Sequence, residues 1–405
     1  MAAGQQIELL KARACARVEE ERSRLVDLSL RIHGAPELQF EEHRASAWLA
    51  DYLESVGFSV ERGAFGLPTA FAARLGSGRP QVAVLCEYDA LPGIGHACGH
   101  NIIAAAGAGA GAALGRVVHE AGGSVVVLGT PAEEGGGGKI LMAREGAFDG
   151  IDAAMMVHPA GMDLAEMDVL AVSQLEVEYH GKAAHASAFP QRGINALDAM
   201  VTAYGAIAQL RQHIRPSERI HGIITDGGLA PNIVPERSAG IFYVRAANMR
   251  HLERLKKRVT SCFEAGALAT GAQLALKTVV PDYCDMDTNG PLADAYKANV
   301  ERLGRKIVKS LGSARGVSGS TDMGNVSKLV PSIHPMIAAS PPGVALHSVE
   351  FAEWTGSEDG NRAAIDGAKA LAMTALDVLC NPDLLFAARG VFAARAAEAR
   401  PEEGR

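Results

Sequence analysis

The stretch from residue 81 to residue 159 alternates short apolar runs with helix-forming segments, and no other feature of the sequence restricts the fold as much. The pattern predicts strands over 81–88, 123–131 and 151–159 and helices over 101–115 and 139–148. Strand–helix–strand order of this kind favours a mostly parallel sheet flanked by helices. In such sheets, ligand-binding and catalytic residues collect at the carboxyl ends of the strands.

Each predicted strand of this stretch ends in polar side chains. Glu87 and Asp89 close the first strand, Glu133 and Glu134 follow the second, and His158 lies at the end of the third. Because successive parallel strands end at one rim of a sheet, residues that are far apart in the sequence can meet there.

Five residues have side chains suited to binding a metal ion: Cys98, His100, Glu134, His158 and His347. A thiolate, imidazoles and a carboxylate together suit zinc, manganese or cobalt. A single histidine or cysteine is most often structural. The prediction of a metal site therefore depends on their joint occurrence, three of the segments lying at predicted strand ends.

The segment TPAEEGGGGK places two glutamates, Glu133 and Glu134, directly after an apolar strand. Neighbouring residues point to opposite faces along a strand, but both can face one site in the turn that ends it. One carboxylate can then bind a metal, while the other takes a proton from the activated water and passes it to a leaving amine. The four glycines let the backbone approach the site and leave room for a substrate.

From about residue 170 the pattern changes to β-α-β-β-α-β, the split βαβ order of a ferredoxin-like domain. We therefore expect an α/β catalytic domain over 1–168 and 283–405, with a mostly parallel sheet flanked by helices. An α+β ferredoxin-like lid or dimerisation domain is expected as an insertion over 169–282.

The charge and composition of the chain indicate which binding partners and which cellular compartment to expect. The net charge of −7 gives no reason to expect binding to nucleic acid or to an anionic membrane. The Gly-rich helix 101–115 is too short for a membrane span, and its small residues favour close packing against the sheet. The N-terminal segment resembles an amphipathic helix rather than a signal peptide, so we expect a cytoplasmic protein. The tail 398–405 is expected to be disordered.

Seven segments follow one another in a characteristic order: CEYDALPGIGHACGHN (86–101), GTPAEEGGGGK (129–139), MMVHP (155–159), GKAAHASAFPQRGINALDA (181–199), GGLAPNIVPE (227–236), GSTDMGN (319–325) and LHS (346–348). Together they resemble the aminoacylase/carboxypeptidase-G metallopeptidases, peptidase family M20. Within that family the chain resembles the amidohydrolase branch, and is most similar to the aminoacylase-1-like β-alanyl-lysine dipeptidases. The resemblance implies two divalent metal ions per subunit, zinc or manganese, with cobalt also suitable.

The resemblance also implies roles for the metal-binding residues. Cys98 matches the bridging ligand, and the other four match further ligands: His100, Glu134, His158 and His347. Glu133 matches the general acid/base, and Asp89 matches the aspartate beside the first metal motif. Glu87 stands where many relatives have a histidine. His96 either supports a metal ligand or caps a helix, and the cap is slightly favoured.

Further roles are implied for the inserted domain. The histidine that His185 matches reaches across a dimer to the partner's active site, where it holds the substrate's carbonyl oxyanion. Asn232 and Arg245 match residues that contact the substrate's carboxylate or acyl end, and His221 is a weaker candidate. Without the resemblance, His185 would be read as an exposed histidine and Arg245 as a strand-edge charge. A Gly/Ser-rich loop adds residues that bind substrate or shape the loop: Ser320, Thr321 and Asp322.

We therefore expect a homodimeric, metal-dependent amidohydrolase. Its substrate would be a small N-acyl amino acid or an unusual dipeptide, similar to β-alanyl-lysine or aminobenzoyl-glutamate. One alternative is a hydrolytic deaminase of a small aromatic amine that uses the same metal site. Another is a non-catalytic binding module on the same fold, against which the complete set of ligands argues.

Overall fold

The computed structural model describes residues 3–308 and 319–399, which form two compact units. The first unit comprises residues 1–167, 287–311 and 325–405, and the second comprises 168–286 and 312–324. The inserted domain was expected over 169–282, so the second unit also takes in a few residues beyond it and the Gly/Ser-rich loop. The tail 398–405 was expected to be disordered, but a helix extends to Ala399. Residues 309–318 and the rest of the tail, 400–405, lie outside the described residues.

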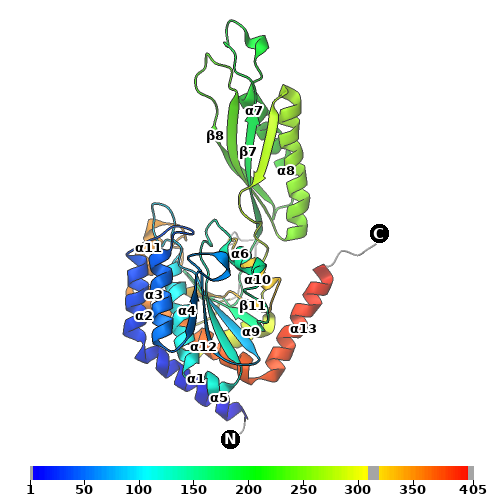
Figure 1. Cartoon of the computed structure of the whole chain (residues 1–405). Coiled ribbons are helices and arrows are strands. Elements are labelled where there is room, and N and C mark those ends of the chain that lie inside the picture. The colour runs from blue at the N-terminus through cyan, green and yellow to red at the C-terminus, as the bar shows by residue number, and fades with distance from the viewer. Residues whose placement is uncertain (1–2, 309–318, 400–405) are drawn as a thin grey trace. The chain divides into compact units, whose positions relative to one another are not determined.

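A six-stranded sheet forms the centre of the first unit (Figure 1). Its strands stand in the order β1 (Ser59–Arg62), β2 (Phe71–Gly76), β4 (Ser124–Gly129), β3 (Gln81–Cys86), β5 (Ala153–Met155) and β11 (Ser332–Ile333). The four strands from β4 to β11 are parallel, whereas β1 and β2 run antiparallel at one edge. The expected mostly parallel α/β sheet is confirmed.

Helices surround this sheet. The α-helices outside the second unit's fold are α1 (Ala3–Glu20), α2 (Arg22–His33), α3 (His43–Ser55), α4 (His100–Gly115), α5 (Val118–Ala121), α6 (Gly138–Arg144), α9 (Gly290–Glu301), α10 (Met323–Ser327), α11 (Val349–Thr355), α12 (Glu358–Cys380) and α13 (Pro382–Ala399). Short 3₁₀ helices cover Ala64–Gly66, Pro190–Arg192 and Arg211–His213. One hydrophobic core joins α1, α2, α3, α4 and α12 to the sheet.

Helix α3 stops at Ser55 and β1 follows, because Gly57 adopts a left-handed φ of 102°. One local prediction was wrong. The single strand expected over 151–159 is broken after β5. Its last part, β6 (His158–Ala160), pairs instead with β12 (Met336–Ala338) in a separate two-stranded parallel sheet.

Helix α4 lies directly on β3, as its small residues predicted. A Cβ atom on Gly107 would lie 2.5 Å from the sulfur of Cys86 and 2.8 Å from the carbonyl oxygen of Leu85. On another side of the helix, a Cβ atom on Gly109 would lie 2.9 Å from the Cβ of Ala368 in α12. The glycines therefore set the spacing between α4, the sheet and α12.

Gly107→Ala is accordingly expected to lower the free energy of unfolding by about 1–3 kcal/mol, because the new methyl group overlaps backbone atoms of β3. The matched control is Gly205→Ala in α7, where a Cβ would meet no atom within 4 Å. That change should be neutral or stabilise the protein by about 0.4–1 kcal/mol. Urea unfolding of both variants gives the comparison, and equal stability of the two would contradict this packing.

The second unit has the predicted β-α-β-β-α-β order. Its elements are β7 (Ala171–His180), α7 (Ala196–Leu210), β8 (Arg219–Asp226), β9 (Arg237–Ala246), α8 (Met249–Thr270) and β10 (Gln273–Thr278). The strands form an antiparallel sheet in the order β10-β7-β9-β8, and α7 and α8 share a hydrophobic core with it. This is the expected ferredoxin-like α+β arrangement.

Among the described residues, no single helix is long and apolar enough to cross a membrane. The pair Glu358–Cys380 and Pro382–Ala397 meets the length and composition criteria only when taken together, across a bend of 95°.

Candidate metal centre

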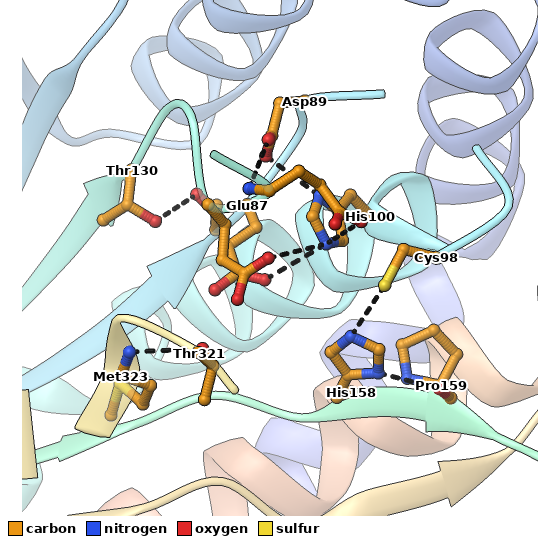
Figure 2. A network of polar contacts seen from close by, with 12 residues as sticks. Glu87, Asp89, Cys98, His100, Thr130, His158, Pro159, Thr321 and Met323 are labelled. Carbon is orange, nitrogen blue, oxygen red and sulfur yellow. Dashed lines mark hydrogen bonds and ion pairs between the residues drawn. The ribbon is translucent and has the colours of Figure 1, made fainter. Parts of the chain in front are cut away.

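Polar residues from three strand ends and two loops of the first unit meet at one place (Figure 2). Glu87 and Asp89 follow β3, and the turn carrying Glu133 and Glu134 follows β4. His158 opens β6, Cys98 lies in the loop before α4, and His100 is the first residue of that helix. His347 enters from the loop before α11 with a left-handed φ of 61°.

Cys98 lies between two histidines. Its sulfur is 3.4 Å from Nε2 of His158 and 3.3 Å from Nε2 of His347, which is itself 3.4 Å from Oε1 of Glu134. Zinc–sulfur and zinc–nitrogen bonds of about 2.3 and 2.0–2.1 Å in tetrahedral geometry separate the ligand atoms by about 3.5 Å. Each of these pairs of atoms is therefore at a separation that suits two ligands of the same ion.

A second group of donor atoms lies around His100. Its Nδ1 lies 2.9 Å from Oδ1 of Asp89, an arrangement that turns Nε2 toward the centre. Around Nε2 lie Oε2 of Glu87 at 3.6 Å, Oε2 of Glu133 at 3.9 Å and Oε1 of Glu134 at 3.8 Å. Three carboxylates thus surround one imidazole nitrogen.

The donor atoms form overlapping groups that could each hold a metal ion. Ligand atoms lie within 4.8 Å of one another in the groups Cys98–His100–His158 and Cys98–Glu134–His347. Cys98 belongs to both, as expected of a bridging ligand. The five predicted metal ligands, with Glu133 and Asp89, are thus brought together in the first unit.

Burial and neighbouring charges shift the pKa values of three of the proposed ligands. Burial raises the pKa of the Cys98 thiol well above its usual range. Burial would lower the pKa of His100, but the Asp89 carboxylate and the Cys98 thiolate hold it well above the ordinary value. Burial and the charge of His100 lower the pKa of His158 to about 4, while its Nδ1 contacts the carbonyl oxygen of Pro159 at 2.8 Å.

Unpaired polar atoms test whether the residues fit a metal ion. Nε2 of His100 and Oε1 of Glu134 are buried without a hydrogen-bond partner among the described residues. Buried polar atoms are seldom left unpaired. A divalent cation would satisfy both atoms and release the protons that compete for the site. The donor set therefore fits a divalent metal.

Two buried carboxylates, those of Asp89 and Glu42, accept hydrogen bonds from the backbone of the turn that carries Glu133 and Glu134. Asp89 accepts a hydrogen bond from the backbone N–H of Glu134 at 2.9 Å, so one carboxylate orients both His100 and this turn. Ala132 adopts a left-handed φ of 58°, and its N–H donates to Oε1 of Glu42 at 2.9 Å. The fully buried Glu42 thus stabilises the strained residue beside Glu133.

Burial, with the charge of Asp89, raises the pKa of Glu42 from 4.5 to about 7. Between these two values the folded protein binds a proton that the unfolded chain has lost, so Glu42 lowers stability as the pH rises from 4.5 to 7. Glu42→Gln removes this term. We therefore expect the free energy of unfolding of the variant, relative to that of the wild type, to increase by up to about 3 kcal/mol between pH 4.5 and pH 7. Both proteins are treated with chelator before the measurement. Urea unfolding at pH 4.5, 6 and 8 measures the difference, and a constant difference would contradict it.

The second unit brings its predicted residues together in two places. Residues around His185 pair with the segment around Asn232, since the N–H of Ala186 donates to the carbonyl oxygen of Asn232 at 3.0 Å. Both predicted side chains are exposed. Nδ1 of His185 accepts from the N–H of Ala188 at 3.3 Å, which leaves Nε2 as the outward nitrogen.

Arg245 lies on β9 beside His221 and Ser320. Its Nη1 donates to Oγ of Ser320 at 2.7 Å, and its Nε donates to Nε2 of His221 at 3.3 Å. Within the described part of the chain, no carboxylate lies at ion-pair distance from Arg245. Thr321 and the buried Asp322 lead into α10, where Oγ1 of Thr321 accepts from the N–H of Met323 at 3.2 Å.

Two residues of the centre, Lys139 and His334, were not predicted. Glu87 forms a buried ion pair with Lys139, and His334 places its ring 5.5 Å from that of His158. Lys139 directly follows the four glycines, and this is the signal that could have revealed it. His96 was expected to cap a helix, but Gly99 occupies the N-cap position of α4, and no side chain caps it.

Comparison with known proteins supports this description. Residues 172–271 match the peptidase dimerisation domain. The Xaa-Arg dipeptidase of Mus musculus is 44% identical over 402 residues, covering 96% of this chain and 93% of that protein. One component of the p-aminobenzoyl-glutamate hydrolase of Escherichia coli (strain K12) is 37% identical over 274 residues, covering 62% of this chain and 57% of that protein.

Among solved structures, a Bacillus subtilis protein described as a dinuclear metal-binding peptidase of the M20 family shares the fold. Its TM-score is 0.66 at 20% identity, and the match covers 89% of this chain and 99% of that one. On the extent and identity of the match to the mouse dipeptidase, the chain belongs to the M20 peptidase family and thus to the hydrolases of peptide and amide C–N bonds, as the ordered motifs predicted.

Proposed function

We propose that this protein is a metal-dependent amidohydrolase that cleaves the amide bond of a small N-acyl amino acid or an unusual dipeptide. The observation that carries the proposal is the pair of ligand groups that share Cys98, with Glu133 beside them. Two divalent ions per subunit, zinc or manganese, are the proposed cofactors. When bound, they would supply Lewis-acid activation of the attacking water and of the substrate carbonyl.

Glu133 is the proposed general base and acid. Its Oε2 lies 3.9 Å from Nε2 of His100, so its carboxylate borders the proposed ligands. It would take the proton of the attacking water and return it to the nitrogen of the leaving amine. Glu134, one residue further on, is the proposed ligand, and Asp89 orients both Glu134 and His100.

The proposed substrate contacts belong to the second unit. Nε2 of His185 would donate a hydrogen bond to the carbonyl oxygen as negative charge develops on it. Arg245, whose polar contacts are neutral, would bind the carboxylate of the substrate, and Asn232 would assist. Ser320 and His221 hold the guanidinium of Arg245 in place, while Thr321 and Asp322 shape the adjoining loop.

A dipeptide with a basic carboxyl-terminal residue is the favoured substrate class. The Xaa-Arg dipeptidase matches nearly the whole chain, whereas the aminobenzoyl-glutamate hydrolase component matches less of it at lower identity. β-Alanyl-lysine and β-alanyl-arginine are therefore the first substrates to test, followed by aminobenzoyl-glutamate and N-acetyl amino acids.

Mass spectrometry of the products tests this function. The wild-type enzyme, reloaded with zinc or manganese, should release a free amino acid from at least one amide of this panel. Simple aminobenzoates are included in the panel as substrates for deamination. Release of ammonia as the only product would indicate that the protein is a deaminase and not an amidohydrolase. Conversion of no amide in the panel would contradict the proposed substrate class.

We also propose that the protein is a homodimer in which His185 serves the partner's active site. His185→Ala should then lower kcat more than it raises KM, because the contact strengthens with the charge of the transition state. Mixing His185→Ala with Glu133→Gln under subunit exchange should restore about a quarter of wild-type activity, since one site of each mixed dimer is intact.

If His185 acts within its own subunit, every site of the mixed dimers lacks one essential group. The mixture would then remain as inactive as the separate variants, and the role in the partner's site would be wrong. His213→Ala, in the same unit, is the control and should leave kcat unchanged.

A further inference from the structure

A fully buried ion pair lies beside the proposed ligands. The side chains of Glu87 and Lys139 are both 0% exposed, and Nζ of Lys139 is 2.5 Å from Oε1 of Glu87. Glu87 follows the last residue of β3, and Lys139 lies in the first turn of α6 after the four glycines. Burying two charges is costly unless their surroundings compensate for the lost hydration.

The second oxygen of Glu87 points toward the proposed metal centre. Oε2 lies 3.6 Å from Nε2 of His100, and neither atom has a hydrogen-bond partner among the described residues (Figure 2). A separation of 3.6 Å is too long for a hydrogen bond between nitrogen and oxygen. It is close to the distance between two donor atoms that share one metal ion.

We propose that Glu87 is an additional oxygen ligand for the ion held by His100, and that Lys139 positions its carboxylate. The contact with Lys139 engages Oε1 and so leaves Oε2 directed at the ion. This assignment rests on the proposed metal-dependent function and adds a ligand to the set predicted from the sequence.

Lys139 offsets part of the negative charge around Glu87. Five groups of the first unit carry negative charge there when ionised: Glu87, Asp89, Glu133, Glu134 and the thiolate of Cys98. Buried charge is tolerated when it is neutralised nearby, so Lys139 allows one more anionic ligand at a centre of two ions.

The other explanation of Glu87 is that it only neutralises Lys139. The two explanations differ in the double variant Glu87→Gln/Lys139→Met, which removes both charges and keeps side chains of similar size. If Glu87 is a ligand, the double variant lacks an oxygen donor and binds metal as weakly as Glu87→Gln. If Glu87 is only a counter-ion, removing Lys139 as well restores binding.

The test is zinc binding to the chelator-stripped full chain, measured by competition with a chromophoric chelator. We expect Glu87→Gln and the double variant to bind one of two zinc ions at least about tenfold more weakly than the wild type. Glu41→Gln, an exposed carboxylate of the same unit, should bind zinc as the wild type does. Circular dichroism checks that each variant is folded, and the double variant removes the buried charge of Lys139 together with that of Glu87.

Wild-type zinc affinity in the double variant would overturn the assignment, and so would wild-type affinity in Glu87→Gln. Both results are independent of catalysis. A protein that binds two zinc ions in a Glu87-dependent way but hydrolyses no amide would refute the proposed function alone. If the protein hydrolyses amides but its zinc affinity is unchanged by the replacement of Glu87, only the assignment of Glu87 as a ligand is refuted.

Discussion

Glu133→Gln is expected to bind metal as the wild type does and to lose nearly all turnover. The amide of glutamine matches the carboxylate in size but cannot take a proton from water at neutral pH. General acid–base catalysis contributes about 10²- to 10⁴-fold, so kcat should fall by at least that factor. The ligands that share Cys98 are untouched by the change, and metal content should therefore stay the same.

Steady-state kinetics and elemental analysis on the same preparation check both parts of this prediction. Glu145→Gln, an exposed glutamate that follows α6, is the matched control and should retain wild-type kcat and metal content. If Glu133→Gln keeps a substantial part of its activity, Glu133 is not the base. If it loses its metal instead, the carboxylate is a ligand rather than a proton carrier.

Cys98→Ala is expected to lose both metal ions, a larger effect than the removal of any other single ligand. Its sulfur lies within 3.4 Å of a nitrogen from each of two histidines, and it belongs to both ligand groups. His347 belongs to only one group, and its side chain is 52% exposed. His347→Ala should therefore keep one ion per subunit.

Elemental analysis after dialysis against a weak chelator measures the two variants side by side. Cys262→Ser, a change in α8 of the second unit, should retain the wild-type metal content and serves as the control. Retention of one ion by Cys98→Ala would mean that the thiolate serves a single metal. Loss of both ions from His347→Ala would mean that the two positions are not filled independently.

Much of the site could be predicted because it depends on local order in the sequence. The apolar runs before Glu87, Glu133 and His158 set the strands, and parallel strands bring their ends to one rim. The close packing of α4 followed from its small residues, and Gly107 shows the contact at the level of atoms.

What could not be predicted depends on long-range burial. Glu42 and Lys139 look like ordinary surface charges in the sequence, yet both are 0% exposed. The break between β5 and β6 arises because His158 pairs with Met336, far along the chain, and no local signal marks that exchange of partners. His334 is buried beside His158 for the same reason.

The central claim is that hydrolysis depends on divalent metal bound at this centre. The most direct measurement is the rate of free amino acid release from β-alanyl-lysine by chelator-stripped enzyme, titrated with zinc or manganese. We predict negligible release without metal and a rise that saturates near two ions per subunit, with Glu133→Gln remaining inactive throughout. Full activity of the stripped enzyme would contradict the claim. A rate that changes neither with added metal nor with the Glu133→Gln substitution would contradict it as well.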